Sequence, residues 1–243
     1  MNGGLEVLSP SSTTRAALIL FALLPLLVSG CYLSPQSRSL VQRSVAAREL
    51  YREPEFVIER LEREGATSLA ARLSFGNETY GQALGQGLIE TLRERLDGGI
   101  LHPNLAASRI NAAGLAESYA RMLDSYDQTN ILDRDVLREL ADAVEVRYFA
   151  VPILLTFREA SNTRFSVFGL RLGKTTSANA RIQLQIWDGE SGRVAWEGIS
   201  DLTLAQETFR EGPIRFEDTV LATWQSLIDE IPSAADAVVS RDD

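Results

Sequence analysis

The sequence predicts an α/β (α+β) domain: a mixed, mostly antiparallel sheet with helices packed on it, preceded by an N-terminal helical arm. Three observations lead to this fold class. Residues 178–204 alternate apolar and polar side chains around a central run of turn formers, as a β-hairpin does. Residues 147–157 are almost all apolar, which is typical of a buried strand. Four further segments repeat apolar residues at helical spacing, and such amphipathic helices cover sheets.

The hairpin at residues 178–204 sets the faces of the predicted sheet. Residues 188–192, with the sequence DGESG, supply its turn. If residue 187 pairs with residue 193, Leu184 faces Trp196, and the apolar side chains of both strands share one face. The opposite face is polar and contains Gln183, Gln185 and Glu197. Two interpretations stay open for this polar face, which is either simply solvated or a docking surface for another protein.

The start of the chain has the pattern of a signal peptide. Residues 16–28 form a thirteen-residue apolar run, too short for a bilayer span of roughly 20 residues. Val28, Ser29 and Gly30 then precede Cys31, the single cysteine of the chain, which therefore has no disulfide partner within it. The alternative is an ordinary signal peptide followed by a buried free thiol.

These four residues resemble the lipobox of bacterial lipoproteins. The resemblance implies that residues 1–30 are removed and that Cys31 carries acyl chains such as palmitate. Tyr32 follows the cysteine, where aspartate is associated with retention in the inner membrane of enteric bacteria. The resemblance therefore implies an outer-membrane lipoprotein that faces the periplasm.

Composition bounds what the rest of the chain can bind. The 243 residues carry a formal net charge of −9 without a cluster of Lys and Arg in sequence. This composition argues against nucleic acid as a partner, because phosphate neutralisation requires clustered positive charge. It also argues against electrostatic binding to anionic lipid, so we expect the acyl anchor to hold the protein at the membrane.

The predicted elements follow in chain order. Residues 31–39 form a short tether, and residues 40–65 form a helical arm that Pro54 splits and Gly65 ends. The arm is either a packed amphipathic helix or a binding site for a partner helix. The α/β domain occupies residues 66–231 and a disordered acidic tail residues 232–243. Within the domain we expect a strand at 68–75, a helix at 80–96, a strand or loop at 100–105, helices at 114–126 and 134–144, strands at 147–157 and 165–172, the hairpin, and a helix at 216–231.

Three motifs resemble chemical sites, and each has a simpler structural interpretation. Residues 169–175 resemble a phosphate loop, but they have three residues between the glycines where that motif has four, and a strand follows. His102, the single histidine, is better explained as a turn residue before a proline. Asp133 and Asp135 are better explained as the cap and first turn of a helix than as a catalytic pair. We therefore expect no enzyme activity, no metal and no cofactor.

The order of several segments resembles a known superfamily of bacterial lipoproteins. These segments are FGNET at residues 75–79, NILDRDVL at 130–137, the apolar strand at 147–157 and WDGESG at 187–192. Over roughly residues 68–230 the chain looks like the superfamily that includes the curli-secretion lipoprotein CsgG, the peptidoglycan-synthase activator LpoB and the N-terminal domain of TolB. The resemblance implies a mixed sheet covered by helices.

Two functions follow from these features, with an enzyme as a third hypothesis. The first is a non-catalytic binding or adaptor module for an envelope protein complex, held at the membrane by its lipid anchor. The second is a subunit of an oligomeric secretion or assembly ring, marked by residues 164–174 if they extend as strands, which would make the protein a homo-oligomer. A deep cleft that groups Asp, Glu, Tyr and Ser side chains would favour the enzyme instead.

Overall fold

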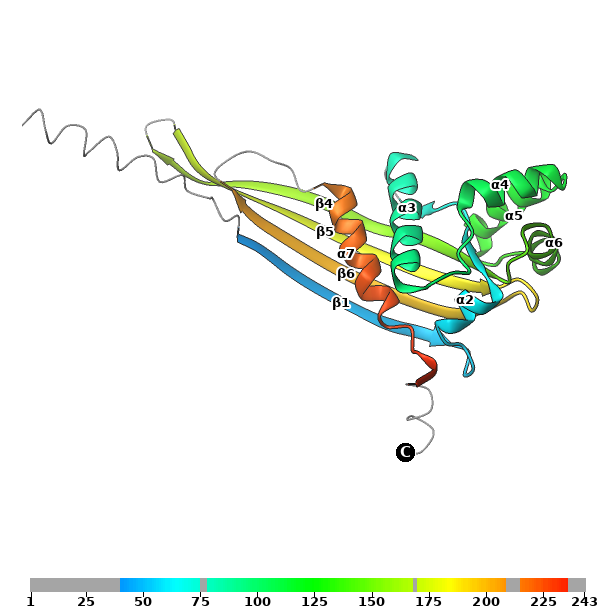
Figure 1. Cartoon of the computed structure of the whole chain (residues 1–243). Helices are drawn as coiled ribbons and strands as arrows, with labels where there is room; N and C mark the ends of the chain where they lie inside the picture. The colour runs from blue at the N-terminus through cyan, green and yellow to red at the C-terminus, as the bar shows by residue number, and fades with distance from the viewer. Residues whose placement is uncertain (1–39, 75–77, 168–169, 209–214, 236–243) are drawn as a thin grey trace, which may run out of the picture. The chain divides into compact units, whose positions relative to one another are not determined.

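The computed structural model describes residues 40–74, 78–167, 170–208 and 215–235, and it confirms the predicted fold class (Figure 1). The strands are β1 (Leu40–Arg52), β2 (Ala66–Ser68), β3 (Arg72–Leu73), β4 (Tyr148–Val167), β5 (Leu170–Asp188) and β6 (Arg193–Thr208). The helices are α2 (Glu59–Glu64), α3 (Glu78–Arg95), α4 (Pro103–Ala112), α5 (Ala116–Thr129), α6 (Arg134–Val144) and α7 (Phe216–Ile228).

The sheet is mixed, with the strand order β1-β6-β5-β4-β2. Neighbours among β1, β6, β5 and β4 are antiparallel, whereas β2 and β3 each pair with β4 in parallel. Pro152 lies on β4 between the parts of that strand that β2 and β3 pair with, and a bulge follows at residues 154–156. The predicted strand at 68–75 is therefore two short strands on either side of this proline.

Helices pack on both faces of the sheet (Figure 1). On the face that we call the first face, α2, α3 and α7 bury a cluster that includes Leu184, Trp196 and Trp224. On the opposite or second face, α4, α5 and α6 bury a cluster that includes Phe149 and Leu140. Because both faces are covered where β4 begins, its first residues are apolar on both sides, as the run at residues 147–157 predicts.

The predicted helical arm at residues 40–65 is wrong for its first half. Residues 40–52 form β1, the edge strand that pairs with β6. Helix α7 contacts β1 on the first face, where Val45 and Ala47 are half-buried, whereas Arg48 on the second face is exposed. A strand with so few buried residues and so many charges has the sequence pattern of an amphipathic helix. Pairing with β6 decides that residues 40–52 form a strand and not a helix.

The predicted hairpin register is wrong, and the predicted faces hold for its apolar residues except Val194. The turn at residues 188–192 is confirmed, and Trp187 pairs with Val194. A register shift follows between Ile186 and Trp187, so that Ile186 lies opposite Trp196 and Leu184 opposite Gly198. The pairing is therefore shifted by one position next to the turn and by two positions beyond the bulge, so Leu184 and Trp196 stay on one face while Val194 packs on the second-face cluster.

Two further boundaries differ from the prediction. Residues 100–105 contain the start of α4, which a short apolar pattern with a proline did not reveal. The first residues of the predicted tail are ordered, because the Pro232 carbonyl accepts from Ile58 N at 3.0 Å and Ala234 N donates to Glu59. Residues 236–243, the tether and the signal peptide lie outside the described residues.

Candidate protein-contact surface

The long strands of the sheet continue past the helices that cover its second face (Figure 1). The buried cluster under α4, α5 and α6 includes Phe149 and Val151, near the start of β4. Farther along the same strand Thr156 and Arg158 are exposed, and on the neighbouring strand Asn179 is exposed as well. The part of the second face beyond α5 is therefore open to solvent, and we call it the uncovered face.

Polar side chains pair across the strands of the uncovered face. Gln183 Nε2 donates to Glu197 Oε1 at 2.5 Å. Thr203 Oγ1 and Asn179 Oδ1 are 2.7 Å apart, and Arg181 forms an ion pair with Asp201 at 3.4 Å. Each pair joins β5 to β6. These pairs stabilise the sheet locally, by a few tenths of a kcal/mol to about 1 kcal/mol each.

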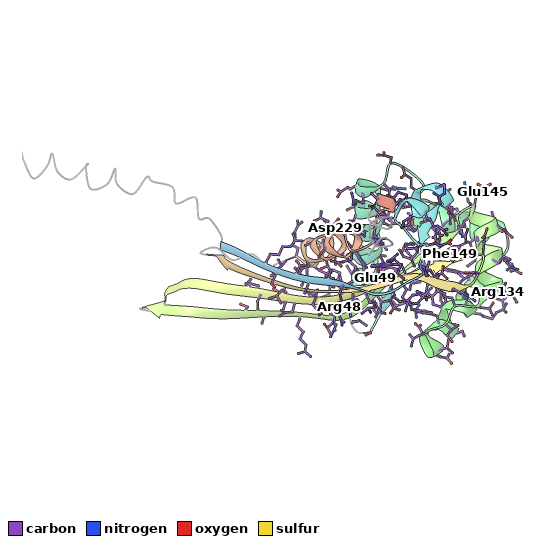
Figure 2. All side chains as sticks on the ribbon, turned by 90° about the horizontal axis from the view of Figure 1, so that it is seen from below. Arg48, Glu49, Arg134, Glu145, Phe149 and Asp229 are labelled. Atoms are coloured by element: carbon purple, nitrogen blue, oxygen red, sulfur yellow. The ribbon has the colours of Figure 1, made fainter. Side chains whose placement is uncertain are left out.

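Neighbouring residues of β1 show how the two faces divide. Arg48 lies opposite Ile199 on β6 and belongs to the second face, whereas Glu49 lies opposite Gly198 and belongs to the first (Figure 2). Glu49 accepts a hydrogen bond from Trp196 Nε1 at 3.0 Å, so this carboxylate completes the first-face core. Arg48 is exposed and contributes positive charge to the rim of the uncovered face.

A hollow of about 720 Å³ lies where the uncovered face meets α5. Its lining combines amides, hydroxyls, one ion pair and apolar side chains: Arg72, Leu73, Ser74, Tyr126, Asp127, Asn130, Ile153, Leu155, Gln183 and Gln185. Arg72 and Asp127 form the ion pair. Ile153 and Leu155 are only half-buried, so apolar surface lies beside polar groups in this hollow.

Gln185 and Tyr126 fix α5 to the sheet below the hollow. Gln185 Oε1 accepts from the Tyr126 hydroxyl at 2.7 Å and from Trp187 Nε1 at 3.0 Å. Burial, with a smaller effect of the nearby Glu197 charge, raises the pKa of Tyr126 to about 12. Of the three predicted contact residues, Gln183 and Glu197 are half-buried on the open surface, while Gln185 is buried and holds the helix.

His102 and Asp133, which the sequence analysis compares with catalytic residues, have structural roles as helix caps. His102 caps α4, since its Nδ1 accepts from Asn104 N at 3.1 Å. Asp133 caps α6 as predicted, accepting from the backbone N–H groups of Asp135 and Val136. In the phosphate-loop-like segment, residues 170–175 belong to strand β5. Val28, Ser29, Gly30 and Cys31 lie outside the described residues.

The described part of the chain holds neither a candidate metal site nor a helix that could span a membrane. No group of three or more His, Cys, Asp or Glu side chains there could hold a metal ion. No helix among those residues is long and apolar enough to span a bilayer.

One exposed pair on β1 was missed by the sequence interpretation. Leu50 and Tyr51 are 43% and 49% exposed, and Tyr51 lies opposite Glu197 in the sheet. The uncovered face therefore ends in an aromatic side chain on its β1 side. Predicting residues 40–52 as a helix hid this neighbour, because only the pairing of β1 with β6 brings it beside Glu197.

Comparisons with known proteins give only distant likenesses. No family model matches the sequence, and no curated protein matches it. Among solved structures, the PelC dodecamer from Paraburkholderia phytofirmans has a TM-score of 0.44 at 10% identity and covers 79% of this chain and 99% of its own. The LpoB C-terminal domain from Salmonella enterica has a TM-score of 0.31 at 14% identity and covers 57% of this chain and 82% of its own.

Proposed function

We propose that this chain is an outer-membrane-anchored periplasmic lipoprotein that acts by contact with an envelope protein and does no chemistry itself. The observation that carries the proposal is the uncovered face, where the sheet runs past its helices and a hollow opens beside α5. Gln183 and Glu197 lie at the edge of this hollow. The anchor is proposed from the lipobox pattern that ends at Cys31.

The chemistry of the uncovered face suits a protein partner. Half-buried Ile153 and Leu155 supply apolar area, while Gln183 and Asn130 offer amide groups that match a polypeptide backbone. Exposed Tyr51 extends the surface, and tyrosine is enriched at protein interfaces. An interface of standard size buries roughly 800 Å² on each partner. In such an interface the hollow would form the centre and the paired polar residues the rim.

The first experiment tests the anchor by metabolic labelling with palmitate. The wild-type chain takes up label and fractionates with the outer membrane, whereas Cys31→Ala takes up none. A matched control combines Cys31→Ala with Ser37→Cys, which restores a thiol six residues outside the lipobox pattern. Label on either variant contradicts the assignment of Cys31.

The second experiment tests the contact surface by reversing its charge. The double substitution Gln183→Lys with Glu197→Lys replaces a hydrogen-bonded pair by two positive charges. Misplaced charge at an interface costs several kcal/mol, so the variant should lose its crosslinked envelope partners in vivo. The matched control, Gln225→Lys with Glu230→Lys, makes the same two exchanges on the exposed side and end of α7.

The outcome separates contact from a general charge effect. We expect the control to keep the partners that the wild type captures, and both variants to keep the wild-type circular dichroism spectrum. If the variant at residues 183 and 197 retains every partner and rescues a deletion strain, the uncovered face is not the contact surface. His102→Ala should also rescue, because His102 caps a helix.

A second candidate function is a subunit of a ring. Within the described residues, no strand pairs with the outer edge of β1, and none pairs with the edge of β4 opposite β5 beyond Leu154. The two edge strands run antiparallel to each other, so β1 of one copy could pair with β4 of the next without a change of direction. Light scattering across a range of protein concentrations distinguishes the two functions: a constant monomer mass excludes the ring.

A further inference from the structure

Strand β1 forms one outer edge of the sheet (Figure 1). It pairs with β6 from Leu40 to Arg52, and within the described residues no strand pairs with its other edge. Residues 43–51 are exposed, apart from half-buried Val45 and Ala47. An open edge presents backbone N–H and C=O groups that another strand can pair with. The outer edge of β1 is therefore a surface for the addition of a strand.

The two faces of the sheet restrict how β1 can pair with a second copy of itself. Between residues 43 and 49, the odd-numbered side chains of β1 lie on the first face and the even-numbered ones on the second. Antiparallel strands join into one sheet only if the side chains that lie opposite each other share a face. In a pair of strands related by a twofold axis, one residue must then lie opposite its own copy.

The charges of β1 favour Ala46 as that central residue. With Ala46 opposite its copy, Arg43 of each chain lies opposite Glu49 of the other, which places opposite charges side by side twice. Centring the pair on Arg48 or on Glu49 would place like charges directly opposite each other, which destabilises a strand pair. Ala46 is also the midpoint of β1, so the same register overlaps all 13 residues of both strands.

The apolar side chains of β1 fit this register as well. With Ala46 in the centre, Val45 of each chain lies opposite Ala47 of the other on the first face, beside the apolar clusters that α7 covers. Centring the pair on Ala47 would instead place Val45 opposite the charged Glu49. The register centred on Ala46 therefore covers apolar surface that a single copy leaves half-exposed.

We propose that β1 pairs with β1 of a second copy of this chain, antiparallel and centred on Ala46, to give a dimer with one continuous sheet. The dimer is closed, because both copies use the same edge, whereas a ring would join β1 to β4. Neighbouring strands lie about 4.8 Å apart, so the β6 strands of the two copies are about 14 Å apart. Helix α7 packs on β6 and β1. Packed helices need about 8–10 Å between their axes, so both copies of α7 fit on the first face.

Single cysteines on the second face of β1 test the register. Ala46→Cys places a thiol opposite its own copy, where Cβ atoms lie about 4.5–5.5 Å apart, close to the distance that a disulfide spans. Ser44→Cys and Arg48→Cys are the matched controls, since each thiol lies about 14 Å from its copy at about 3.4 Å per residue. All three sites are exposed. Membranes from cells that express the whole chain are oxidised with copper phenanthroline, and dimers are scored on a non-reducing gel.

We expect the Ala46→Cys dimer to be about tenfold or more as abundant as the dimer of either control, because a disulfide does not form between Cα atoms more than about 7 Å apart. Two tagged chains that carry Ser44→Cys and Arg48→Cys separately should form a mixed dimer when expressed together, because these residues lie opposite each other. No dimer with any variant, or a stronger dimer with either control alone, overturns the proposal.

The native thiol needs its own control. Cys31 stays in place, and the chain without an introduced cysteine shows any dimer that forms through Cys31 itself. The proposed dimer does not depend on the lipid anchor. The palmitate experiment reports on Cys31 separately, so failure of the anchor and failure of the dimer give different results.

A charge change at the strand edge provides a second test that needs no thiol. Arg43→Glu replaces two attractive pairs by two repulsive ones, so it should raise the dissociation constant of the dimer on the order of tenfold. Arg43 also donates to the Ala222 carbonyl at 2.9 Å. Arg43→Gln is therefore the matched control, because it removes this side chain without adding negative charge, and it should weaken the dimer less.

Light scattering over a range of concentrations of the detergent-solubilised chain measures these dissociation constants. A mass that rises from one copy to two and no further supports the proposal. A mass that stays at one copy or exceeds two copies overturns it, and so does equal weakening by Arg43→Glu and Arg43→Gln.

Discussion

At the scale of single residues, close packing around Trp196 decides the register of the hairpin. A Cβ atom at Gly198 would lie 2.3 Å from Trp196 Cη2, so only glycine fits beneath the indole ring. Leu184 lies opposite this glycine and is fully buried. The bulge therefore places a residue without a side chain opposite Leu184, where the buried indole ring of Trp196 needs the space.

Leu184→Ala is expected to destabilise the protein by about 2–5 kcal/mol, because it opens a cavity in a core without free space. Gln183→Ala, one residue away on the other face, loses only the pair with Glu197 and should cost about 1 kcal/mol or less. Urea unfolding measures both. Equal midpoints for the two variants would contradict the assignment of faces.

Asp188 carries the clearest pH dependence. Burial alone would raise the pKa of its carboxyl, but hydrogen bonds from Arg147 and from the backbone N–H of Glu190 lower that pKa below the ordinary 3.8. The unfolded chain therefore binds a proton more readily than the folded one. The stabilisation is complete above the unfolded pKa and is lost as pH falls through the folded pKa.

We expect Asp188→Asn to lower stability at pH 7 and to flatten the loss of stability below about pH 4. Urea unfolding between pH 2 and pH 7 measures this slope. Glu117→Gln is the control, because its pair with Arg121 is mostly exposed and exposed pairs contribute little. If Asp188→Asn and the wild type lose stability equally as the pH falls, the ion pair between Arg147 and Asp188 does not cause the acid dependence.

At the scale of elements, side-chain caps set where two helices of the second face begin. Asp133→Ala and His102→Ala each remove an acceptor for orphan backbone N–H groups and should cost about 0.5–2 kcal/mol. His102→Asn keeps an acceptor at the cap and should recover most of the loss. Thermal unfolding tests these variants, and a loss of stability in His102→Asn equal to that in His102→Ala would exclude the cap.

At the scale of the whole molecule, one sheet separates two buried clusters and couples them. Leu88 on the first face and Leu140 on the second are both fully buried. Because both clusters pack on the same strands, we expect Leu88→Ala and Leu140→Ala to lower the midpoint of a single shared transition. Leu105→Ala, at a site 47% exposed on α4, should leave the midpoint nearly unchanged.

Circular dichroism and tryptophan fluorescence provide the two probes for this prediction. Trp196 and Trp224 report on the first face and Trp187 on the second. Coincident curves from both probes indicate cooperative unfolding of the sheet with both helical layers. Two separated transitions in either variant would show that the layers unfold independently.

Elements that depend on local signals can be predicted without knowledge of the fold. The helix at residues 134–144 has a capping aspartate and a clear apolar stripe, and the structure gives it the same bounds. The turn at residues 188–192 follows from its turn formers, and the faces of residues 182–186 follow from their strict alternation. Each of these signals needs only neighbouring residues, so tertiary contacts did not have to be known.

Tertiary structure alone decided the features that depend on distant partners. Residues 40–52 become a strand because the edge of β6 is free to pair, and their own pattern resembles a helix. Gln185 is removed from the open surface by a hydroxyl 59 positions earlier in the chain. Tyr51 lies beside Glu197 only because β1 pairs with β6, and no local pattern in residues 40–52 indicates that pairing.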